Sequence, residues 1–254
     1  MKMLIKLYRS FKSRINQYQR EKRGKTVFKK QHILYSSILK ENDIFFDVGA
    51  NWGEKLEIVK DLKVKTIAIE PQIKCADSIR ERFPNVILEN IALGSEAGEL
   101  EMYISNADTL STLSTDFIQN TSSESGRFNR YKWDEKVLVK VDTLENLISK
   151  HGKPKFIKID VEGFEEQVLK GLKTPVDFIS FEFTLPEMYD SFLRCIEILN
   201  KVYSENILFN VCAGSTYEYS YKDWLSYEQF LNKAKTGELT SIGGGDIYVK
   251  SNFK

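Results

Sequence analysis

Residues 44–53 read IFFDVGANWG and pass from an apolar strand into a turn that carries two glycines. A second apolar strand, residues 66–69, follows in the sequence and ends at Glu70. In an open α/β sheet, ligands bind outside the carboxyl ends of the strands, and an acid after the second strand can accept hydrogen bonds from both hydroxyls of a ribose. Glycines let the backbone approach such a ligand closely. The stretch therefore predicts a nucleoside-cofactor site, and the alternative is a purely structural turn.

The spacing within this turn narrows the choice of cofactor. Gly49 and Gly53 read GxxxG, which is not the GxGxxG spacing that seats a pyrophosphate on a helix N-terminus. Asp47 stands just before the first glycine, where its carboxylate would repel a phosphate but could hold an ammonium group, directly or through water. S-Adenosylmethionine has an ammonium group, a ribose and no phosphate, so we expect it as the cofactor.

Composition sets the frame for this site. The chain has 254 residues and a formal net charge of +1, which fits one α/β domain with a full core and gives no global argument for nucleic-acid binding. Its three cysteines, Cys75, Cys195 and Cys212, are far apart, which argues against a disulfide scaffold or a zinc knuckle and favours a reducing cytoplasm. The sequence shows neither a signal peptide nor an apolar run near the roughly 20 residues of a spanning helix, so we expect a cytoplasmic protein.

The N-terminal segment is strongly basic. Between residues 1 and 30, eleven lysines and arginines face a single acid, Glu21, and apolar residues recur at helical spacing. We expect residues 1–35 to form a basic amphipathic helical extension. One interpretation is peripheral contact with an anionic membrane, at its inner face, or with a phosphate-bearing carrier. The other is a helix docked on the domain with its basic face in water.

Strands and helices alternate along the rest of the chain, which is typical of a parallel sheet with crossover helices. We expect seven strands in one doubly wound, mostly parallel sheet, at residues 44–48, 65–70, 86–89, 156–160, 177–183, 206–211 and 246–250. The intervening helices are expected at residues 54–62, 74–82, 143–150, 164–171 and 187–202. Residues 241–246, SIGGGD, are interpreted as a turn, because no helix follows to bind a phosphate.

Two further segments interrupt this rhythm. Residues 99–104 and 136–141 alternate polar and apolar, so they predict two half-exposed strands in a short extra β insertion. Between them, residues 105–134 are rich in Ser, Thr and Asn, and their apolar groups look too sparse for a core element. A loop of this length is usually functional or disordered, and we expect a substrate-side loop. The aromatic-rich residues 217–235 are expected to be a packed insertion, although their rings could line a sugar.

A second acidic constellation ends the strand at residues 156–160. Residues 156–165 read FIKIDVEGFE, so the strand ends in Asp160 and Glu162 before a glycine and a helix. This places both acids at the same sheet rim as Asp47 and Glu70. With DVGANWG at 47–53, IEP at 69–71, NIALG at 90–94 and SFEF at 180–183, the chain resembles the FkbM family of S-adenosylmethionine-dependent methyltransferases. The resemblance covers roughly residues 40–185 and extends more weakly to the final strand.

The resemblance implies a Rossmann-like class I methyltransferase domain over residues 36–254 and O-methylation of hydroxyl groups on glycans, polyketides and other metabolites. The cofactor-binding residues that it implies are Asp47, Gly49, Ala50, Asn51 and Gly53 around the methionine part, Glu70 and Pro71 at the ribose, Asn90, Ile91 and Ala92 at the adenine, and Asp160. The implied catalytic residues are Asp160, Glu162 and Glu182. The basic extension and the C-terminal aromatic segment lie outside the resemblance, so substrate choice is not carried over.

The chemistry of the acids leaves several interpretations open. A general base can take the proton of an alcohol as the methyl group moves across. Asp160 and Glu162 can instead share a proton or hold a divalent metal, although we assign no residue as a metal ligand. Both acids could also merely cap the following helix, and Glu182 could orient the substrate or form an ion pair at the rim.

Three functions are compatible with these sequence features. The first is methyl transfer to a hydroxyl, on a sugar of a bacterial surface glycan or on a related metabolite. The second is an NAD-dependent oxidoreductase on the same architecture, which the absence of GxGxxG and the presence of Asp47 disfavour. The third is a non-catalytic scaffold. Because His32 and His151 lie outside the rim motifs, a Ser-His-Asp hydrolase is a weak alternative.

Overall fold

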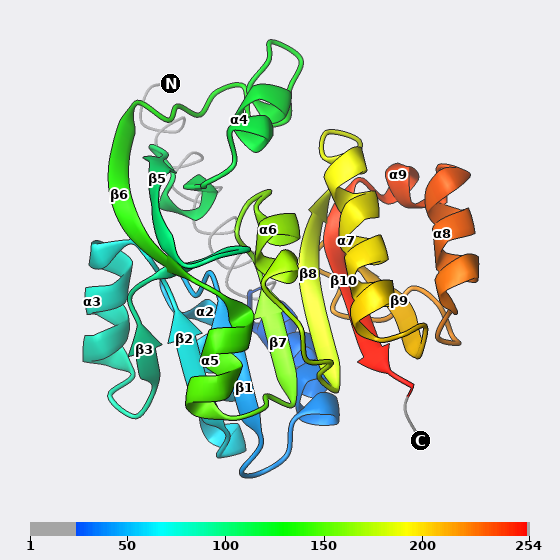
Figure 1. The fold of residues 1–254 in the computed structure, drawn as a ribbon, viewed down its shortest axis with the longest axis horizontal. Helices are drawn as coiled ribbons and strands as arrows, with labels where there is room; N and C mark the ends of the chain where they lie inside the picture. The colour runs from blue at the N-terminus through cyan, green and yellow to red at the C-terminus, as the bar shows by residue number, and fades with distance from the viewer. Residues whose placement is uncertain (1–23, 253–254) are drawn as a thin grey trace, which may run out of the picture.

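The computed structural model describes residues 24–252 (Figure 1). The greater part of the predicted basic extension therefore lies outside the described residues. Within them, residues 24–38 are helical, and Leu34 and Tyr35 of this helix are buried against the domain. The described residues contain no helix with the length and apolar character needed to cross a membrane.

A seven-stranded sheet forms the centre of the described chain, with the strand order β3-β2-β1-β7-β8-β10-β9. Its strands are β1 (Ile44–Val48), β2 (Lys65–Ile69), β3 (Ile87–Glu89), β7 (Phe156–Ile159), β8 (Phe178–Thr184), β9 (Ile207–Ala213) and β10 (Gly244–Ser251). All neighbouring strands pair in parallel except β10, which is antiparallel to both β8 and β9. The prediction of a doubly wound, mostly parallel α/β sheet is confirmed.

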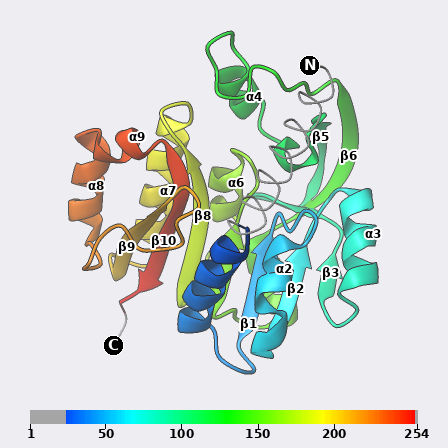
Figure 2. The same cartoon turned by 180° about the vertical axis from the view of Figure 1, so that it is seen from behind.

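Helices cover both faces of this sheet (Figures 1 and 2). On one face, α5 (Leu144–His151), α6 (Glu165–Lys170) and α7 (Tyr189–Val202) bury their apolar sides against β7, β8 and β10. On the other face lie residues 24–38 and α2 (Glu54–Val59), which the 3₁₀ turn η1 (Lys60–Leu62) extends. The helix α3 (Ile73–Arg82) packs near β2 and β3. Two further helices, α8 (Tyr227–Lys235) and α9 (Glu238–Ile242), precede β10.

A small second sheet extends above the carboxyl ends of the main sheet. Its order is β4-β6-β5, formed by β4 (Ala92–Leu93), β5 (Gly98–Ile104) and β6 (Glu135–Asp142). The two long strands pair antiparallel, and this confirms the extra β insertion. The two-residue strand β4 was not predicted, because a segment of that length carries no periodicity in sequence.

The expectation that residues 105–134 form no core element is wrong. They contain the 3₁₀ turn η2 (Asp108–Leu110) and the helix α4 (Thr115–Thr121). Ser114 caps α4, since its Oγ accepts a hydrogen bond from Phe117 N at 3.0 Å. Phe117 is fully buried against Phe128 and Trp133, whose rings come from the far side of the segment. Aromatic residues that converge from scattered positions leave no periodic pattern, so the sequence conceals this cluster.

The glycine run at residues 241–246 is only partly a turn, and this corrects the prediction. The helix α9 ends at Ile242, and β10 begins at Gly244, which pairs with Thr184 of β8. A Cβ on Gly245 would lie 2.2 Å from the carbonyl oxygen of Cys212 on β9. The glycine is therefore needed for strand packing, which sequence alone does not distinguish from a turn.

Candidate active site

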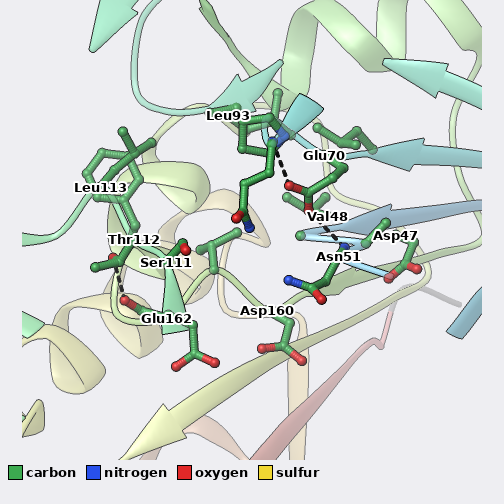
Figure 3. A pocket seen from close by; sticks show the side chains of 18 of the residues that line it. Asp47, Val48, Asn51, Glu70, Leu93, Ser111, Thr112, Leu113, Asp160 and Glu162 are labelled. Atoms are coloured by element: carbon green, nitrogen blue, oxygen red, sulfur yellow. Dashed lines mark hydrogen bonds between the residues drawn. The ribbon is translucent and has the colours of Figure 1, made fainter. Parts of the chain in front are cut away.

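A cavity opens at the carboxyl ends of β1, β2 and β7 (Figure 3). Its volume is about 930 Å³ when the space open to solvent is included. Its walls come from the β1 turn, the segment after β2, strand β4 and the turn after β7. Thr109 and residues 111–113 line it from the 105–134 segment. The rim predicted from sequence is therefore a real cavity, formed where parallel strands end together.

Two glycines shape the turn after β1. Gly49 has φ +81°, and a Cβ at this position would lie 1.9 Å from the carbonyl oxygen of Asp160. Gly53 also has φ +81°, and its Cβ would lie 2.7 Å from the ring of Phe83. Both positions combine a left-handed backbone with close approach, so only glycine fits without strain. The result is a turn held tightly against the end of β7.

Glu70 holds this turn by its side chain. One carboxylate oxygen accepts from Asn51 N at 2.8 Å and the other from Gln72 N at 2.7 Å. Burial raises the pKa of Glu70 to about 7, against the opposing effect of these hydrogen bonds. Each carboxylate oxygen has a further lone pair, so Glu70 can still accept from a ligand hydroxyl.

Asp47 is a buried carboxylate with spare bonding capacity. It lines the cavity and is 1% exposed, and its Oδ2 has no hydrogen-bond partner among the described residues. Burial raises its pKa to about 7, although Lys55 and Lys158 oppose the rise. An unpaired buried carboxylate oxygen is costly unless a donor reaches it. The ammonium group of a methionine moiety is such a donor, and the residues present fit this cofactor.

The predicted catalytic acids come together on the β7 and β8 side of the cavity. One oxygen from each of Asp160, Glu162 and Glu182 lies within 4.8 Å of the others. Figure 3 shows Asp160 and Glu162 beside the cavity. Burial and the neighbouring Asp160 raise the pKa of both Glu162 and Glu182 well above the ordinary value. Burial also acts to raise the pKa of Asp160, but Lys158 and Lys55 outweigh it, and the pKa is lowered.

The interpretation of Asp160 and Glu162 as helix caps finds no support in the contacts. The N-cap of α6 is Phe164, and no side-chain hydrogen bond caps it. Instead, Glu165 Oε1 accepts from Val161 N at 3.1 Å and Gly163 N at 3.3 Å, and so holds the turn after β7. Sequence reasoning did not assign Glu165 a role, although it stands in the same acidic run.

The 105–134 segment closes one side of the cavity. The carbonyl oxygen of Asp108 accepts from Asn51 Nδ2 and from Gln72 Nε2, both at 3.2 Å, and its carboxylate pairs with Lys74. Thr112 Oγ1 donates to the carbonyl of Glu162 at 2.7 Å. These contacts tie the segment to both sides of the rim, in keeping with the expected position beside the site.

The other predicted residues divide between lining and support. Ala50, Pro71, Ile91 and Ala92 line the cavity. Asn90 lies behind it, where its Nδ2 donates to the carbonyls of Glu70 at 2.8 Å and Pro71 at 3.1 Å. Gly53 shapes the turn, and Glu182 lies in a smaller hollow behind the β7 turn. His151 contacts Glu89 at 2.6 Å, outside the cavity lining.

Sequence reasoning missed three charged residues at the site. Lys158 lies in the middle of β7, Asp246 on β10, and Lys55 in the first turn of α2. Lys158 Nζ donates to Asp246 Oδ1 at 2.6 Å and lies 3.3 Å from Asp160 Oδ2. Lys158 could have been recognised from the sequence, because it is a lysine inside the apolar run FIKI, and a buried lysine requires an acidic partner.

The class of protein follows from three features: the sheet order, the glycine turn, and the two acids Asp47 and Glu70 in the cavity wall. Together they define a Rossmann-like protein that binds a nucleoside cofactor. The family described as "Methyltransferase FkbM domain" matches residues 47–220, more than half of the chain, and the chain belongs to this family. It is thus an S-adenosylmethionine-dependent methyltransferase, and the predicted resemblance and cofactor are confirmed.

Three methyltransferases are among the similar solved structures, each at low sequence identity. A precorrin-6y C5,15-methyltransferase from Geobacter metallireducens is 12% identical with a TM-score of 0.43, and 87% of this chain and 86% of that chain are covered. A TehB-like methyltransferase from Corynebacterium glutamicum is 9% identical with a TM-score of 0.46, at the same coverages. An rRNA methylase from Streptococcus thermophilus is 10% identical with a TM-score of 0.41, covering 87% and 93%. No curated protein matches the chain.

Proposed function

We propose that this methyltransferase transfers the methyl group to a hydroxyl, on a sugar of a glycan or on a related metabolite. The observation that carries the proposal is Asp160, a carboxylate with a lowered pKa at the edge of the cofactor cavity. An alcohol is a weak nucleophile, so a base within hydrogen-bond reach accelerates its attack. A carboxylate that stays ionised at neutral pH can accept that proton.

In this proposal, some residues of the rim bind the cofactor and others take part in the reaction. Asp47 and Glu70 hold the ammonium and the ribose hydroxyls, and Gly49 lets the backbone approach between them. When bound, the cofactor supplies an electrophilic methyl group. Asp160 accepts the proton of the acceptor hydroxyl. Glu162, with its raised pKa, carries a proton and donates a hydrogen bond to the acceptor. Glu182, whose pKa is also raised, carries a proton and donates a hydrogen bond to Asp160, so it orients the base from behind the cavity. Fixed geometry converts the encounter into an in-line, effectively unimolecular attack.

The same acids indicate the kind of acceptor. The ionised carboxylate of Asp160 disfavours an anionic group beside the reacting hydroxyl, because like charges repel. Protonated carboxyls and a carboxylate together offer donors and acceptors, which suits a neutral polyol such as a sugar. Lys158 supplies the positive charge at 3.3 Å from Asp160, so we favour proton sharing over divalent-metal binding in this cluster.

The experiment is methyl transfer from radiolabelled S-adenosylmethionine to a panel of neutral oligosaccharides. Matched amino-sugar and thiol-bearing acceptors serve as controls, and the labelled product is analysed for its methyl linkage. We expect label on oxygen with the wild type and none with Asp160→Asn. Transfer to nitrogen or sulfur alone, or full activity of Asp160→Asn, would contradict the proposal.

Peripheral association through the basic segment is a separate part of the proposal. Its support is the charge of residues 1–30. Because Leu34 and Tyr35 are buried in the domain, the sharper deletion removes residues 1–23 only. We expect this deletion to abolish sedimentation with anionic vesicles and to leave cofactor affinity unchanged. Equal sedimentation of the full and shortened chains would refute membrane contact.

A further inference from the structure

Lys158 occupies an unusual position for a lysine. It is the third residue of β7, all four residues of which are buried, and its side chain is 2% exposed. Side chains alternate along a strand, so Lys158 shares a face with Asp160, while Ile157 and Ile159 enter the apolar core on the other face. An isolated buried charge is costly, so the neighbours of this ammonium determine what it does.

Two carboxylates face the ammonium from different depths. Asp246 Oδ1 is 2.6 Å from Lys158 Nζ, and its side chain is 11% exposed. Asp160 Oδ2 is 3.3 Å from the same nitrogen, and its side chain is 31% exposed. Asp246 stands directly opposite Glu182 in the pairing of β10 with β8. The lysine therefore lies beneath a row of acids from three strands and connects a buried anchor to a carboxylate at the cavity.

The three rim acids cannot all be ionised at such short separations. A nearby cation determines which acid keeps its charge. In the described part of the chain, Lys158 provides the only ammonium within 4.0 Å of any of the three acids, and it lies beside Asp160. Burial acts to lower the pKa of Lys158, but Asp160 and Asp246 outweigh it and keep the lysine charged. The lowered pKa of Asp160 and the raised pKa values of Glu162 and Glu182 follow the same geometry.

We propose that Lys158, anchored by Asp246, is a positioning residue that fixes Asp160 as the ionised member of the rim cluster and leaves the protons on Glu162 and Glu182. The catalytic meaning of this selection rests on the proposed function. There, the hydroxyl proton passes to Asp160, an O–CH₃ bond forms, and the S–CH₃ bond breaks with its electron pair remaining on sulfur. Without the ammonium, one of the two protons of the cluster would settle on Asp160 as readily as on Glu162 or Glu182.

Other charged and titratable groups influence the pKa values of Asp160 and Lys158. They come from the elements packed around the end of β7: Tyr35 from residues 24–38, Asp47 from β1, Lys55 from α2, Glu162 and Glu165 from the β7 turn and α6, Glu182 from β8, Tyr217 after β9, and Asp246 from β10. Glu70, after β2, acts on Asp47. Lys55 is the second cation in this set. It lowers the pKa of Asp160 less than Lys158 does, so Lys158→Met should have a large effect with Lys55 intact.

The test measures ionisation directly and needs no acceptor. The full chain, labelled with ¹³C at the aspartate carboxyl carbons, is titrated from pH 5 to 8 by NMR, and loss of a resonance in Asp160→Asn assigns Asp160. We expect Asp160 to stay ionised throughout in the wild type. In Lys158→Met its resonance should titrate within this window, and Lys158→Arg should restore the wild-type behaviour.

Two further variants separate this role from folding. Lys158→Met leaves Asp246 buried without its partner, whereas Lys158→Met combined with Asp246→Asn removes both charges and is expected to be better tolerated. This double variant should still show Asp160 titrating within the window. Lys155→Met is the matched control, because Lys155 also precedes an apolar strand residue but pairs with Asp177 at 2.6 Å. It should leave the Asp160 resonance as in the wild type.

The outcomes distinguish the two proposals. Each variant is first shown to be folded by its thermal unfolding and by saturable S-adenosylmethionine binding. If Asp160 remains ionised in the folded double variant, the role of Lys158 is overturned, whatever the reaction. If Asp160 titrates as expected but Asp160→Asn still methylates hydroxyl groups, the electrostatic role of Lys158 is supported and the assignment of Asp160 as base is overturned.

Discussion

Cofactor affinity should rise with pH between 5.5 and 7, because Asp47 must lose a proton before its carboxylate can hold the ammonium of S-adenosylmethionine. Burial raises its pKa to about 7, so about 3% of Asp47 is ionised at pH 5.5 and about half at pH 7. If only the ionised form binds well, affinity increases about sixteenfold across this range, or about 1.6 kcal/mol. The cofactor amine remains largely protonated over the same range, since an α-amino group titrates near pH 7.7–8.0.

Isothermal titration calorimetry measures both sides of this linkage. Binding at pH 6 should release about 0.9 proton from Asp47, which appears as a dependence of the measured enthalpy on the ionisation enthalpy of the buffer. Asp47→Asn keeps the size of the side chain and should remove this released proton. Glu70 has a pKa of about 7 as well, so proton release that persists in Asp47→Asn and disappears in Asp47→Asn combined with Glu70→Gln belongs to Glu70. Affinity independent of pH, with no proton released, would refute the pairing of Asp47 with the ammonium.

Three further predictions concern binding, stability and metal. Glu70→Ala should weaken cofactor binding by about 1–3 kcal/mol, because a buried charged acceptor is lost. Glu89→Ala is the control, because the Glu89 carboxylate pairs with Lys150 and His151. Equal cofactor affinities of Glu70→Ala and the wild type would remove Glu70 from the site. Without cofactor, the free energy of unfolding should fall as pH rises from 5 to 8. Asp47, Glu70 and Glu165 keep their protons in the folded state up to about pH 7, whereas in the unfolded chain they lose them at ordinary carboxyl pKa values. The melting temperature should drop by several degrees, as roughly 1 kcal/mol corresponds to about 2–4 °C, and a rise would contradict the assigned burial. Methyl transfer should survive EDTA, because Lys158 supplies the charge beside Asp160, and loss of activity that a divalent ion restores would show a metal site instead.

Much of the fold follows from local sequence patterns. Apolar strands that alternate with helical periodicity predict the parallel sheet, and the acids that end those strands must then share one rim. Asp47, Glu70 and Asp160 could therefore be placed together from their positions after β1, β2 and β7 alone. Gly49 and Gly53 could also be recognised from the sequence, because they lie at the two ends of the turn between β1 and α2. The structure leaves little room for a side chain at either position.

The parts that escaped prediction depend on contacts between distant segments. Asp246 reaches Lys158 only because β10 inserts antiparallel beside β8, and no local pattern specifies that insertion. The cluster around Phe117 likewise gathers rings from both ends of a polar segment. Lys158 itself was visible as a charge within an apolar strand, but its partners were not. Local periodicity thus locates the rim, whereas the electrostatic organisation beneath it depends on tertiary structure.

The most direct test of the account is a parallel calorimetric titration of the full chain with S-adenosylmethionine and with NAD. The cavity offers an unpaired carboxylate oxygen at Asp47 and, at Glu70, a carboxylate that can accept hydrogen bonds from ribose hydroxyls, without the glycine spacing for a pyrophosphate. We predict saturable binding of one S-adenosylmethionine per chain, weakened in Glu70→Ala, and no binding of NAD. Binding of NAD alone, or of neither compound, would contradict the assignment of this cavity as the methyl-donor site.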